Sequence, residues 1–190
     1  MHVALLRVGG VAILCFALHK NYRLLRDEYM VDFKYQEATI ADMERIWDKN
    51  IKANPEWITW RDEAIENYKD GTTCKTFVVL NVNDPIGEVT MIFSPKHKEI
   101  GGRTDLANGV DVASINALRV EKAYRQQGHS TKLMRAIEQH AINAGYKRLT
   151  IGVEPKDARN IAIYLHWGYT NFVRYDIEEG ELVLYYSKTL

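Results

Sequence analysis

The stretch 118–133 reads LRVEKAYRQQGHSTKL and gives the strongest structural signal in the chain. A β-rich segment ends at Val120, a short loop contains Gly128, and an amphipathic helix is expected over 130–144. A loop that leads from a strand into a helix leaves backbone N–H groups without partners at the helix N-terminus, where the helix dipole also favours an anion. Gly128 permits a positive φ and a close approach of the backbone to a ligand. The stretch therefore predicts a site for a phosphate or pyrophosphate group.

The charge around this loop agrees with an anionic ligand. Residues 119–135 contain one acidic residue, Glu121, and five basic residues, which are Arg119, Lys122, Arg125, Lys132 and Arg135. The chain as a whole is neutral, with 25 basic and 25 acidic residues. No GxxxxGK[ST] or GxGxxG sequence occurs, so the chain lacks the signatures of P-loop nucleotidases and of Rossmann dehydrogenases.

The composition is that of a globular protein. With 190 residues, 46% of them hydrophobic and 26% charged, the chain is long enough for one domain with a core that needs no disulfide or metal. A net charge of zero argues against a dedicated nucleic-acid binder. The two cysteines, Cys15 and Cys74, form no CxxC pair, and no HExxH occurs, so no metal site is predicted. This cysteine usage favours a cytoplasmic location.

An apolar run of 11 residues, 8–18, stands apart from the rest of the chain. As a helix it would span about 16 Å, against a hydrocarbon core of about 30 Å, so no membrane span is expected. Residues 1–29 are interpreted as an N-terminal extension and residues 30–190 as the domain. Two alternatives stay open: an additional helix packed on the domain, and a secretion or anchor signal, although no small-x-small cleavage site follows the run.

Hydrophobic periodicity predicts an alternation of strands and helices after residue 31. Strands are expected at 32–38, 76–82, 86–93, 110–120, 148–153, 171–175 and 181–186, with turns at Asn83-Asp84-Pro85 and Glu179-Gly180. Helices are expected after Thr39, at 57–68, at 130–144 and at 157–167. The predicted order is β-α-α-β-β-β-α-β-α-β-β.

Three segments resemble the GNAT superfamily of N-acyltransferases. The hexamer Arg125-Gln126-Gln127-Gly128-His129-Ser130, preceded by Val120 and Tyr124, resembles the acyl-CoA signature of that family. The segment 157–169 (DARNIAIYLHWGY) resembles its helix with a tyrosine and a following glycine-aromatic pair, and 38–42 resembles its first strand–helix junction. The resemblance runs from Asp32 to Leu190, and the predicted order of elements is that of the family.

The resemblance implies an α/β fold (α+β in some schemes) in three layers, with a mixed, largely antiparallel central sheet and helices on both faces. It also implies acetyl-CoA as co-substrate and no metal. The implied acetyl-CoA-binding residues are Leu118, Val120, Arg125, Gln126, Gln127, Gly128, His129, Ser130, Thr131 and Asn160. The chain departs from the family pattern at Ser130, where Gly or Ala is usual, and at Asp157, where Asn is usual. The family's Asn contacts the pantetheine arm of the cofactor, and Asn160 is expected to make this contact in place of Asp157.

The reaction that the resemblance implies is attack of an amine on a thioester. The thioester carbonyl is then placed at the backbone N–H of Val120, and Tyr164 is the implied proton donor to the departing thiolate. Glu88 is the nearest carboxylate candidate for the base, and an exposed hairpin charge is the competing interpretation of this residue. His129 and His166 stand at variable family positions, so neither is expected to act as a catalytic side chain.

The region 56–70 predicts the nature of the acceptor. It contains five acidic and two basic residues, and Trp57 and Trp60 are interleaved with them. Acids with aromatic rings suit a cationic amine, although core tryptophans beside a solvated charged face explain the same pattern. The sequence therefore predicts transfer of an acetyl group from acetyl-CoA to a primary amine of a small cationic acceptor. The alternatives are a catalytically inactive acyl-CoA sensor and an interaction domain; a homodimer is compatible with all three.

Overall fold

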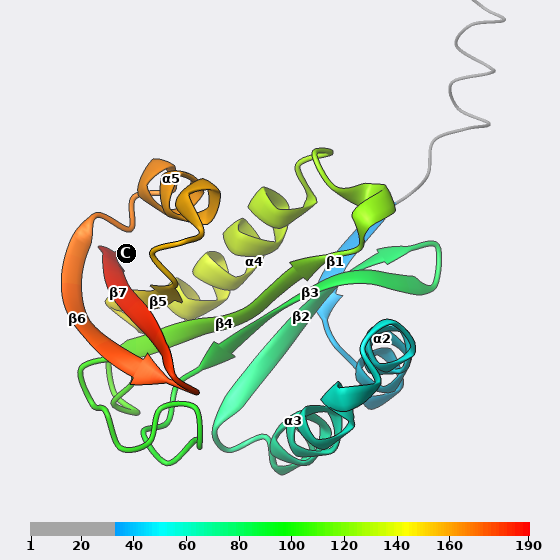
Figure 1. The fold of residues 1–190 in the computed structure, drawn as a ribbon, viewed down its shortest axis with the longest axis horizontal. Coiled ribbons are helices and arrows are strands. Elements are labelled where there is room, and N and C mark those ends of the chain that lie inside the picture. The colour runs from blue at the N-terminus through cyan, green and yellow to red at the C-terminus, as the bar shows by residue number, and fades with distance from the viewer. Residues whose placement is uncertain (1–32) are drawn as a thin grey trace, which may run out of the picture. The chain divides into compact units, whose positions relative to one another are not determined.

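The computed structural model describes residues 33–190, so the predicted extension 1–29 lies outside the described residues. These residues form one seven-stranded sheet in the order β1-β2-β3-β4-β5-β7-β6 (Figure 1). Neighbouring strands are antiparallel, except that β4 and β5 run parallel. The strands are β1 (Phe33–Glu37), β2 (Cys74–Asn81), β3 (Asp84–Ile92), β4 (Val112–Val120), β5 (Arg148–Val153), β6 (Asn171–Glu178) and β7 (Glu181–Thr189).

Helices cover both faces of the sheet. α2 (Ile40–Ala53) and α3 (Ile58–Asp70), joined by the 3-10 turn Pro55–Trp57, pack on one face of β2 and β3. α4 (His129–Asn143) packs on the other face, against β1 to β4, and α5 (Ala158–His166) lies on β5 (Figure 1). The predicted three-layer fold, with a mixed and largely antiparallel sheet, is confirmed.

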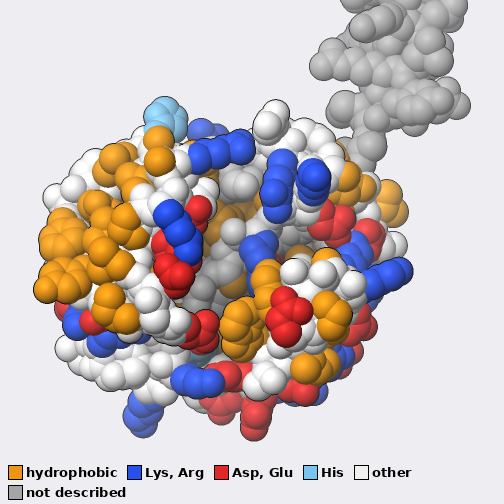
Figure 2. Space-filling view, in the orientation of Figure 1, with side chains coloured by type: hydrophobic (Ala, Val, Ile, Leu, Met, Phe, Trp, Pro, Cys, Tyr) orange, Lys and Arg blue, Asp and Glu red, His pale blue; other side chains and the backbone are white. Residues whose placement is uncertain are grey.

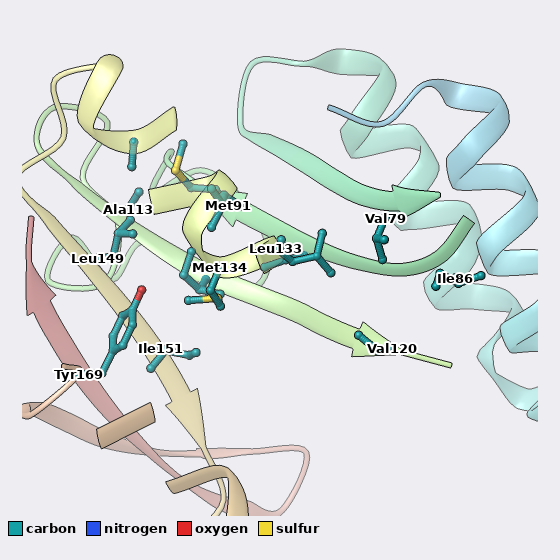
Figure 3. Packing of buried hydrophobic residues seen from close by; sticks show 14 residues of the cluster. Val79, Ile86, Met91, Ala113, Val120, Leu133, Met134, Leu149, Ile151 and Tyr169 are labelled. Atoms are coloured by element: carbon teal, nitrogen blue, oxygen red, sulfur yellow. The ribbon is translucent and has the colours of Figure 1, made fainter. Parts of the chain in front are cut away.

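The side chains of β2 alternate between the two faces of the sheet, which explains why two cores form. Val79 faces α4 and belongs to the main core, in which Leu133, Met134 and Ile137 of α4 meet the sheet (Figure 3). Val78 and Leu80 face the opposite side, where Met43, Ile46 and Trp47 of α2 cover them. Each of these side chains is buried, and a fully buried aliphatic side chain contributes about 1.5–3 kcal/mol. Hydrophobic residues thus recur every second position in the strand and every third or fourth position in the helices, and these repeats place the side chains that join the layers.

The start of α2 is fixed by a capping box. The Thr39 hydroxyl accepts from the Asp42 backbone N–H at 3.1 Å, and the Asp42 carboxylate accepts from the Thr39 backbone N–H at 2.9 Å. Arg45 donates to the other Asp42 oxygen at 2.6 Å. Burial alone would raise the pKa of Asp42, but the hydrogen bonds from Thr39 and Arg45 outweigh burial and lower it.

Three predicted boundaries differ from the structure. The β2–β3 turn comprises Val82 and Asn83, so Asp84 and Pro85 lie in β3 rather than in the turn. α4 begins at His129, one residue before the predicted start, and its N-cap is Gly128. The last two strands extend to Glu178 and Thr189, beyond the predicted ends, because they pair with each other along a hairpin whose turn is Glu179-Gly180.

The parallel pair β4–β5 opens toward its carboxyl end. The two strands pair only over Val112–Ile115 and Arg148–Ile151, although β4 continues to Val120. An irregularity opposite Glu88–Thr90, with Ala117 at φ 52°, bends β4 just where this pairing stops. The far half of β4 therefore has a backbone edge that β5 does not cover.

Candidate active site

Two cavities meet at the uncovered half of β4. The loop cavity has a volume of about 960 Å³ and is lined mainly by the loop 121–128, the start of α4, the end of α2 and α5. The acidic cavity has a volume of about 720 Å³ and is lined by α2, α3, β3, the loop after β3 and the β6–β7 hairpin. Leu118 and Val120 face the loop cavity, Asn116 and Ala117 face the acidic cavity, and Arg119 lines both. The end of β4 thus separates two spaces that adjoin at Arg119.

The loop at the start of α4 presents a series of free donors. Gln126 and Gly128 have φ values of 65° and 80°, and these left-handed conformations wind the backbone around the loop cavity. Within residues 33–190, the backbone N–H groups from Gln126 to Thr131 donate to no protein acceptor, and the helical ladder begins with Lys132 donating to the Gly128 carbonyl. A row of free N–H groups at a helix N-terminus suits a phosphate group.

Gly128 leaves the cradle open. A Cβ built at this position would find no atom within 4 Å, so the space beside the loop is free for a ligand. The basic side chains of Lys122, Arg125 and Arg159 line the loop cavity, and so does Lys49, which pairs with Asp84 and Glu121. Arg125 also donates through Nε to the Val120 carbonyl at 2.9 Å, which ties the loop to the end of β4. Loop and side chains together fit a ligand with several phosphates.

Most of the residues predicted to bind acetyl-CoA line the loop cavity. These are Leu118, Val120, Arg125, Gln126, Gly128, His129, Ser130, Thr131 and Asn160. Gln127 does not; its side-chain amide donates to the Ala123 carbonyl at 3.2 Å. Residues from three separate parts of the chain are thus brought together as the sequence pattern predicts.

The His129 side chain has a structural role. Its Nδ1 lies 2.6 Å from the Tyr35 hydroxyl, and the rings of Phe33, Tyr35 and Tyr124 surround it. Burial and the nearby Lys132 lower the His129 pKa, so the ring is neutral at pH 7. The side chain ties the start of α4 to β1, and the backbone of His129 is the part that faces a ligand.

Tyr164 contributes a hydroxyl without a protein partner. It lies on α5, lines the loop cavity and stacks at 5.9 Å on Trp167. No hydrogen bond to its hydroxyl is formed within residues 33–190. Burial and the Asp157 carboxylate raise the Tyr164 pKa above 10, so the phenol carries its proton at neutral pH. Packing alone holds the side chain, and its protonated hydroxyl is free to donate a hydrogen bond to a ligand in the loop cavity.

Carboxylates dominate the acidic cavity. Seven glutamates line it against three cationic side chains. The glutamates are Glu63, Glu88, Glu99, Glu154, Glu178, Glu179 and Glu181, and the cations are Lys98, Arg103 and Arg119. Most of these acids have an ion-pair partner, but Glu99 and Glu179 have none within residues 33–190. Figure 2 shows a hollow in the middle of the drawn face with acidic side chains along its margin.

Glu88 lies at the inner end of this cavity and is buried, with 1% of its surface exposed. The interpretation as an exposed hairpin charge was therefore wrong. Its Oε1 accepts from Arg119 Nε at 3.0 Å and from Arg119 Nη2 at 2.6 Å. Burial raises the Glu88 pKa, and Arg119 only partly opposes this effect. The carboxyl group is therefore a better proton acceptor near neutral pH than an exposed glutamate.

The acidic wall predicted on 56–70 is only partly present. Of its five acids only Glu63 lines the acidic cavity, beside Trp60. Trp57 lines the loop cavity instead, where its ring lies 5.7 Å from the Arg119 guanidinium. The remaining acids of the cavity come from β3, from the loop after β3, from the end of β5 and from the β6–β7 hairpin.

Two residues of the site were not singled out from the sequence. Arg119 pairs with Glu88 and lies 4.5 Å from the Trp47 ring, so it is held between both cavities. Gly87 lies opposite Val120, and a Cβ there would be 2.8 Å from the Arg119 carbonyl oxygen. A glycine inside a strand is a signal of close backbone approach, and this signal could have indicated Gly87. The only sequence signal for Arg119 was its position in the basic stretch 119–135.

Within residues 33–190, no group of three or more His, Cys, Asp or Glu side chains is arranged to bind a metal ion. No helix in the same part of the chain has the length and apolar character that a bilayer span requires.

Comparison with known proteins assigns the family. The family model of the acetyltransferase (GNAT) family matches residues 22–169. The chain belongs to the GNAT acetyltransferase family. It is therefore an acyltransferase that uses acetyl-CoA as acyl donor. No curated protein sequence matches the chain.

Solved structures of GNAT acetyltransferases have the same fold. The chain is similar to Arabidopsis thaliana NAA60 in complex with a bisubstrate analogue, with a TM-score of 0.63 and 16% identity over 83% of this chain and 98% of that chain. It is also similar to a GNAT family acetyltransferase from Elizabethkingia anophelis with acetyl-CoA bound, with a TM-score of 0.57 and 18% identity over 83% and 98% of the two chains. A third, the PaiA N-acetyltransferase of Thermoplasma acidophilum in complex with coenzyme A, has a TM-score of 0.57 and 12% identity over 84% and 99%.

Proposed function

We propose that this GNAT acetyltransferase transfers the acetyl group of acetyl-CoA to a primary amine of a small cationic acceptor. The loop cavity takes acetyl-CoA and the acidic cavity takes the acceptor. The observation that carries this proposal is the pair of cavities that adjoin at Arg119 on the uncovered end of β4, one with free N–H donors and the other lined by carboxylates.

The loop cavity suits the donor. The free N–H groups between Gln126 and Thr131 and the cations Lys122 and Arg125 are placed for the pyrophosphate of coenzyme A. The uncovered edge of β4 ends at Val120, whose N–H is then close to the thioester carbonyl. Tyr164 and Asn160 face the same cavity from α5 and lie along the route from pyrophosphate to thioester.

The acidic cavity suits a cationic acceptor. Seven carboxylates against three cations give it a negative potential, which attracts an ammonium group and repels a carboxylate. Glu99 and Glu179, without ion-pair partners in the described part of the chain, are free to pair with a second positive charge. Burial and the adjacent Glu63 and Glu178 raise the Glu99 pKa, which a bound cation would relieve. Trp60, which is 44% exposed, adds an aromatic face for a cation.

The chemistry divides between two side chains and one backbone group. Glu88 accepts a proton from the acceptor ammonium, and the free amine nitrogen attacks the thioester carbonyl carbon. The Val120 N–H stabilises the negative charge on the carbonyl oxygen. When the carbon–sulfur bond breaks, the Tyr164 hydroxyl donates its proton to the departing thiolate. The nitrogen became positively charged on attack, and its second proton passes by way of solvent to the resulting tyrosinate, so the amide product is neutral and Tyr164 is reprotonated. Arg119 holds the Glu88 carboxylate in place from the strand opposite.

A thiol-release assay with acetyl-CoA tests the acceptor class. The panel contains polyamines, aminoglycosides, neutral primary amines and anionic amino acids. We expect kcat/KM to be highest for acceptors with two or more positive charges and to fall as salt screens the acidic cavity. Faster turnover of anionic amino acids than of polyamines or aminoglycosides would overturn the proposed acceptor class.

Charge-neutralising variants test which acids bind the acceptor. Glu99→Gln and Glu179→Gln each remove one unpaired carboxylate from the acidic cavity and should raise KM for a dicationic acceptor about three- to tenfold with kcat nearly unchanged. Glu66→Gln is the matched control, because Glu66 is exposed on α3 and does not line the cavity. An equal rise in KM for all three variants would show that only the overall charge of the protein matters.

We also propose that residues 30–190 carry the whole activity. The described sheet, both cavities and their lining residues lie within 33–190, which supports this boundary. A chain that begins at Met30 should unfold cooperatively and retain kcat and KM. Aggregation of that chain, or loss of its cooperative melt, would show that residues 1–29 are part of the domain.

We place the protein in the cytoplasm. The buried free thiol of Cys74 suits a reducing compartment. Cell fractionation with an antibody against the full chain tests this location, and recovery with a membrane or secreted fraction would contradict it.

A further inference from the structure

The strand β6 forms an unprotected outer edge of the sheet. It is eight residues long, and no strand pairs with its outer side within residues 33–190 (Figure 1). Its sequence, NFVRYDIE, contains no proline and no lysine, and a bulge between Phe172 and Arg174 leaves Arg174–Glu178 as the regular part of the edge. The outer N–H and C=O groups of β6 are therefore open to a second strand.

One face of this edge is apolar. Phe172, Tyr175 and Ile177 of β6 and Leu182 of β7 are exposed to 57%, 65%, 67% and 40% and form the edge patch. Figure 2 shows hydrophobic side chains gathered at the left of the view, where β6 lies in Figure 1. With about half of each side chain exposed, the patch covers roughly 400 Å², a size at which apolar patches on monomers often have a function.

The charges of β6 select a partner and a register. If two β6 strands pair antiparallel with Tyr175 opposite Tyr175 of the partner subunit, Arg174 lies opposite the partner's Asp176, and the same pair recurs across the two-fold axis. The bulge between Phe172 and Arg174 leaves Val173 outside this regular pairing. Moving the axis to Arg174 or to Asp176 would place like charges directly opposite each other, which is destabilising. Only the register centred on Tyr175 pairs opposite charges on both sides of the axis.

The ion pairs around Arg174 lie beside that axis, where a second copy of the chain adds further partners. Arg174 donates to Asp105 at 3.3 Å and to Asp176 at 3.0 Å, and Asp176 also accepts from Arg103 at 2.8 Å. Both Arg174 and Asp176 remain partly exposed, with 35% and 24% of their side-chain surface accessible. A second copy would add an oppositely charged side chain to each end of this row.

We propose that two copies of this chain associate by antiparallel pairing of their β6 strands, centred on Tyr175. The backbone bonds of the edge and the side chains of the edge patch form the interface, and the two sheets become continuous. An edge patch of roughly 400 Å² is about half of what a standard interface buries on each partner, so the backbone pairing supplies the rest. We therefore expect a dimer with a Kd in the micromolar range.

Sedimentation velocity of the full chain from about 1 to 100 µM tests the association. The mass should rise from 21.9 kDa toward twice that value. Tyr175→Lys places two positive charges next to each other at the axis and should keep the protein monomeric. Val82→Lys is the matched control, because Val82 has the same 65% exposure as Tyr175 but lies on the β2–β3 hairpin, and this variant should dimerise normally. A wild-type monomer at every concentration, or a dimer that survives Tyr175→Lys, would overturn the proposal.

Disulfide trapping tests the register independently. Directly opposite residues of antiparallel strands have Cα atoms about 4.5–5.5 Å apart, within disulfide range. A Tyr175→Cys variant in a Cys15→Ser background should therefore form a covalent dimer on mild oxidation, while Cys74 is buried and does not react. Phe172→Cys is the control in the same patch, because its two copies would lie about 20 Å apart. Efficient cross-linking through position 172 but not 175 would contradict the register.

Discussion

Replacement of Tyr164 by phenylalanine separates a proton donor from a packing residue. The change keeps the ring that stacks on Trp167 at 5.9 Å and removes only the hydroxyl. No hydrogen bond to that hydroxyl is formed within residues 33–190, so its removal leaves no partner unsatisfied. The free energy of unfolding should therefore change by less than about 0.5 kcal/mol.

The expected effect on catalysis is much larger. A general acid contributes about 10²–10⁴-fold, and a thiolate is a moderately good leaving group, so kcat should fall by about a hundredfold, which corresponds to about 2.7 kcal/mol in the barrier. Because burial raises the Tyr164 pKa above 10, the phenol stays protonated from pH 6 to 9. The ratio of wild-type to variant kcat should therefore be constant over this range.

Steady-state kinetics and calorimetry with acetyl-CoA measure both effects. Tyr169→Phe is the matched control, because Tyr169 is also buried but donates to Glu138 at 3.2 Å away from both cavities. That variant should lose stability and keep kcat. A kcat of Tyr164→Phe within threefold of wild type, with unchanged affinity for acetyl-CoA, would mean that the thiolate leaves unaided or takes its proton from water.

Three further changes test the base, the loop and the helix cap. Glu88→Gln should lower kcat about a hundredfold. In the wild type, kcat should rise with pH as the buried Glu88, whose pKa is raised, ionises, and this rise should be absent in the variant. A rise that persists in the variant over a pH series would assign the base to another group. Gly128 and Gly145 both have open surroundings and positive φ values, 80° and 87°, so replacing either by alanine should lower Tm by a few degrees. Gly145→Ala is therefore the control: calorimetry should show at least a tenfold loss of acetyl-CoA affinity only for Gly128→Ala. Asp42→Ala should lower the free energy of unfolding by about 1 kcal/mol at pH 7. Because the Asp42 pKa is lowered in the folded state, this cost should shrink as the pH falls through that lowered pKa; urea unfolding that shows the same cost at neutral and at strongly acidic pH would contradict the capping role.

The order of elements could be predicted because local patterns determine it. The alternation in β2 and the stripe Met43, Ile46 and Trp47 of α2 are visible in the sequence and reappear as the two cores. The β2–β3 turn was misplaced because Asn83-Asp84-Pro85 is strong turn chemistry. The β2–β3 hairpin instead continues its strand pairing to Asn81 and Asp84, which leaves a two-residue turn with the β-branched Val82 at φ 60°. Continued pairing along the hairpin overrode the turn preference of Asn83-Asp84-Pro85 there.

The two cavities differ in how far the sequence could predict them. The hexamer and α5 supply the part of the loop cavity whose members could be named in advance, and the end of α2 adds residues that could not. The acidic cavity is assembled from α2, α3, β3, the loop after β3 and the β6–β7 hairpin, which lie far apart in the sequence. The burial of Glu88 follows from the position of Arg119 on the neighbouring strand, and strand register is invisible in a single sequence.

Arg119 lines both cavities, so we expect it to make the binding of acetyl-CoA and of the proposed amine acceptor thermodynamically dependent on each other. If its side chain takes a different position when one ligand is bound, the free energy of binding the other ligand changes. By linkage, the factor by which acetyl-CoA alters the affinity for the amine must equal the factor by which the amine alters the affinity for acetyl-CoA. Two calorimetric titrations, each with the second ligand or its unreactive analogue present and absent, measure that coupling, and Arg119→Met should bring it toward zero.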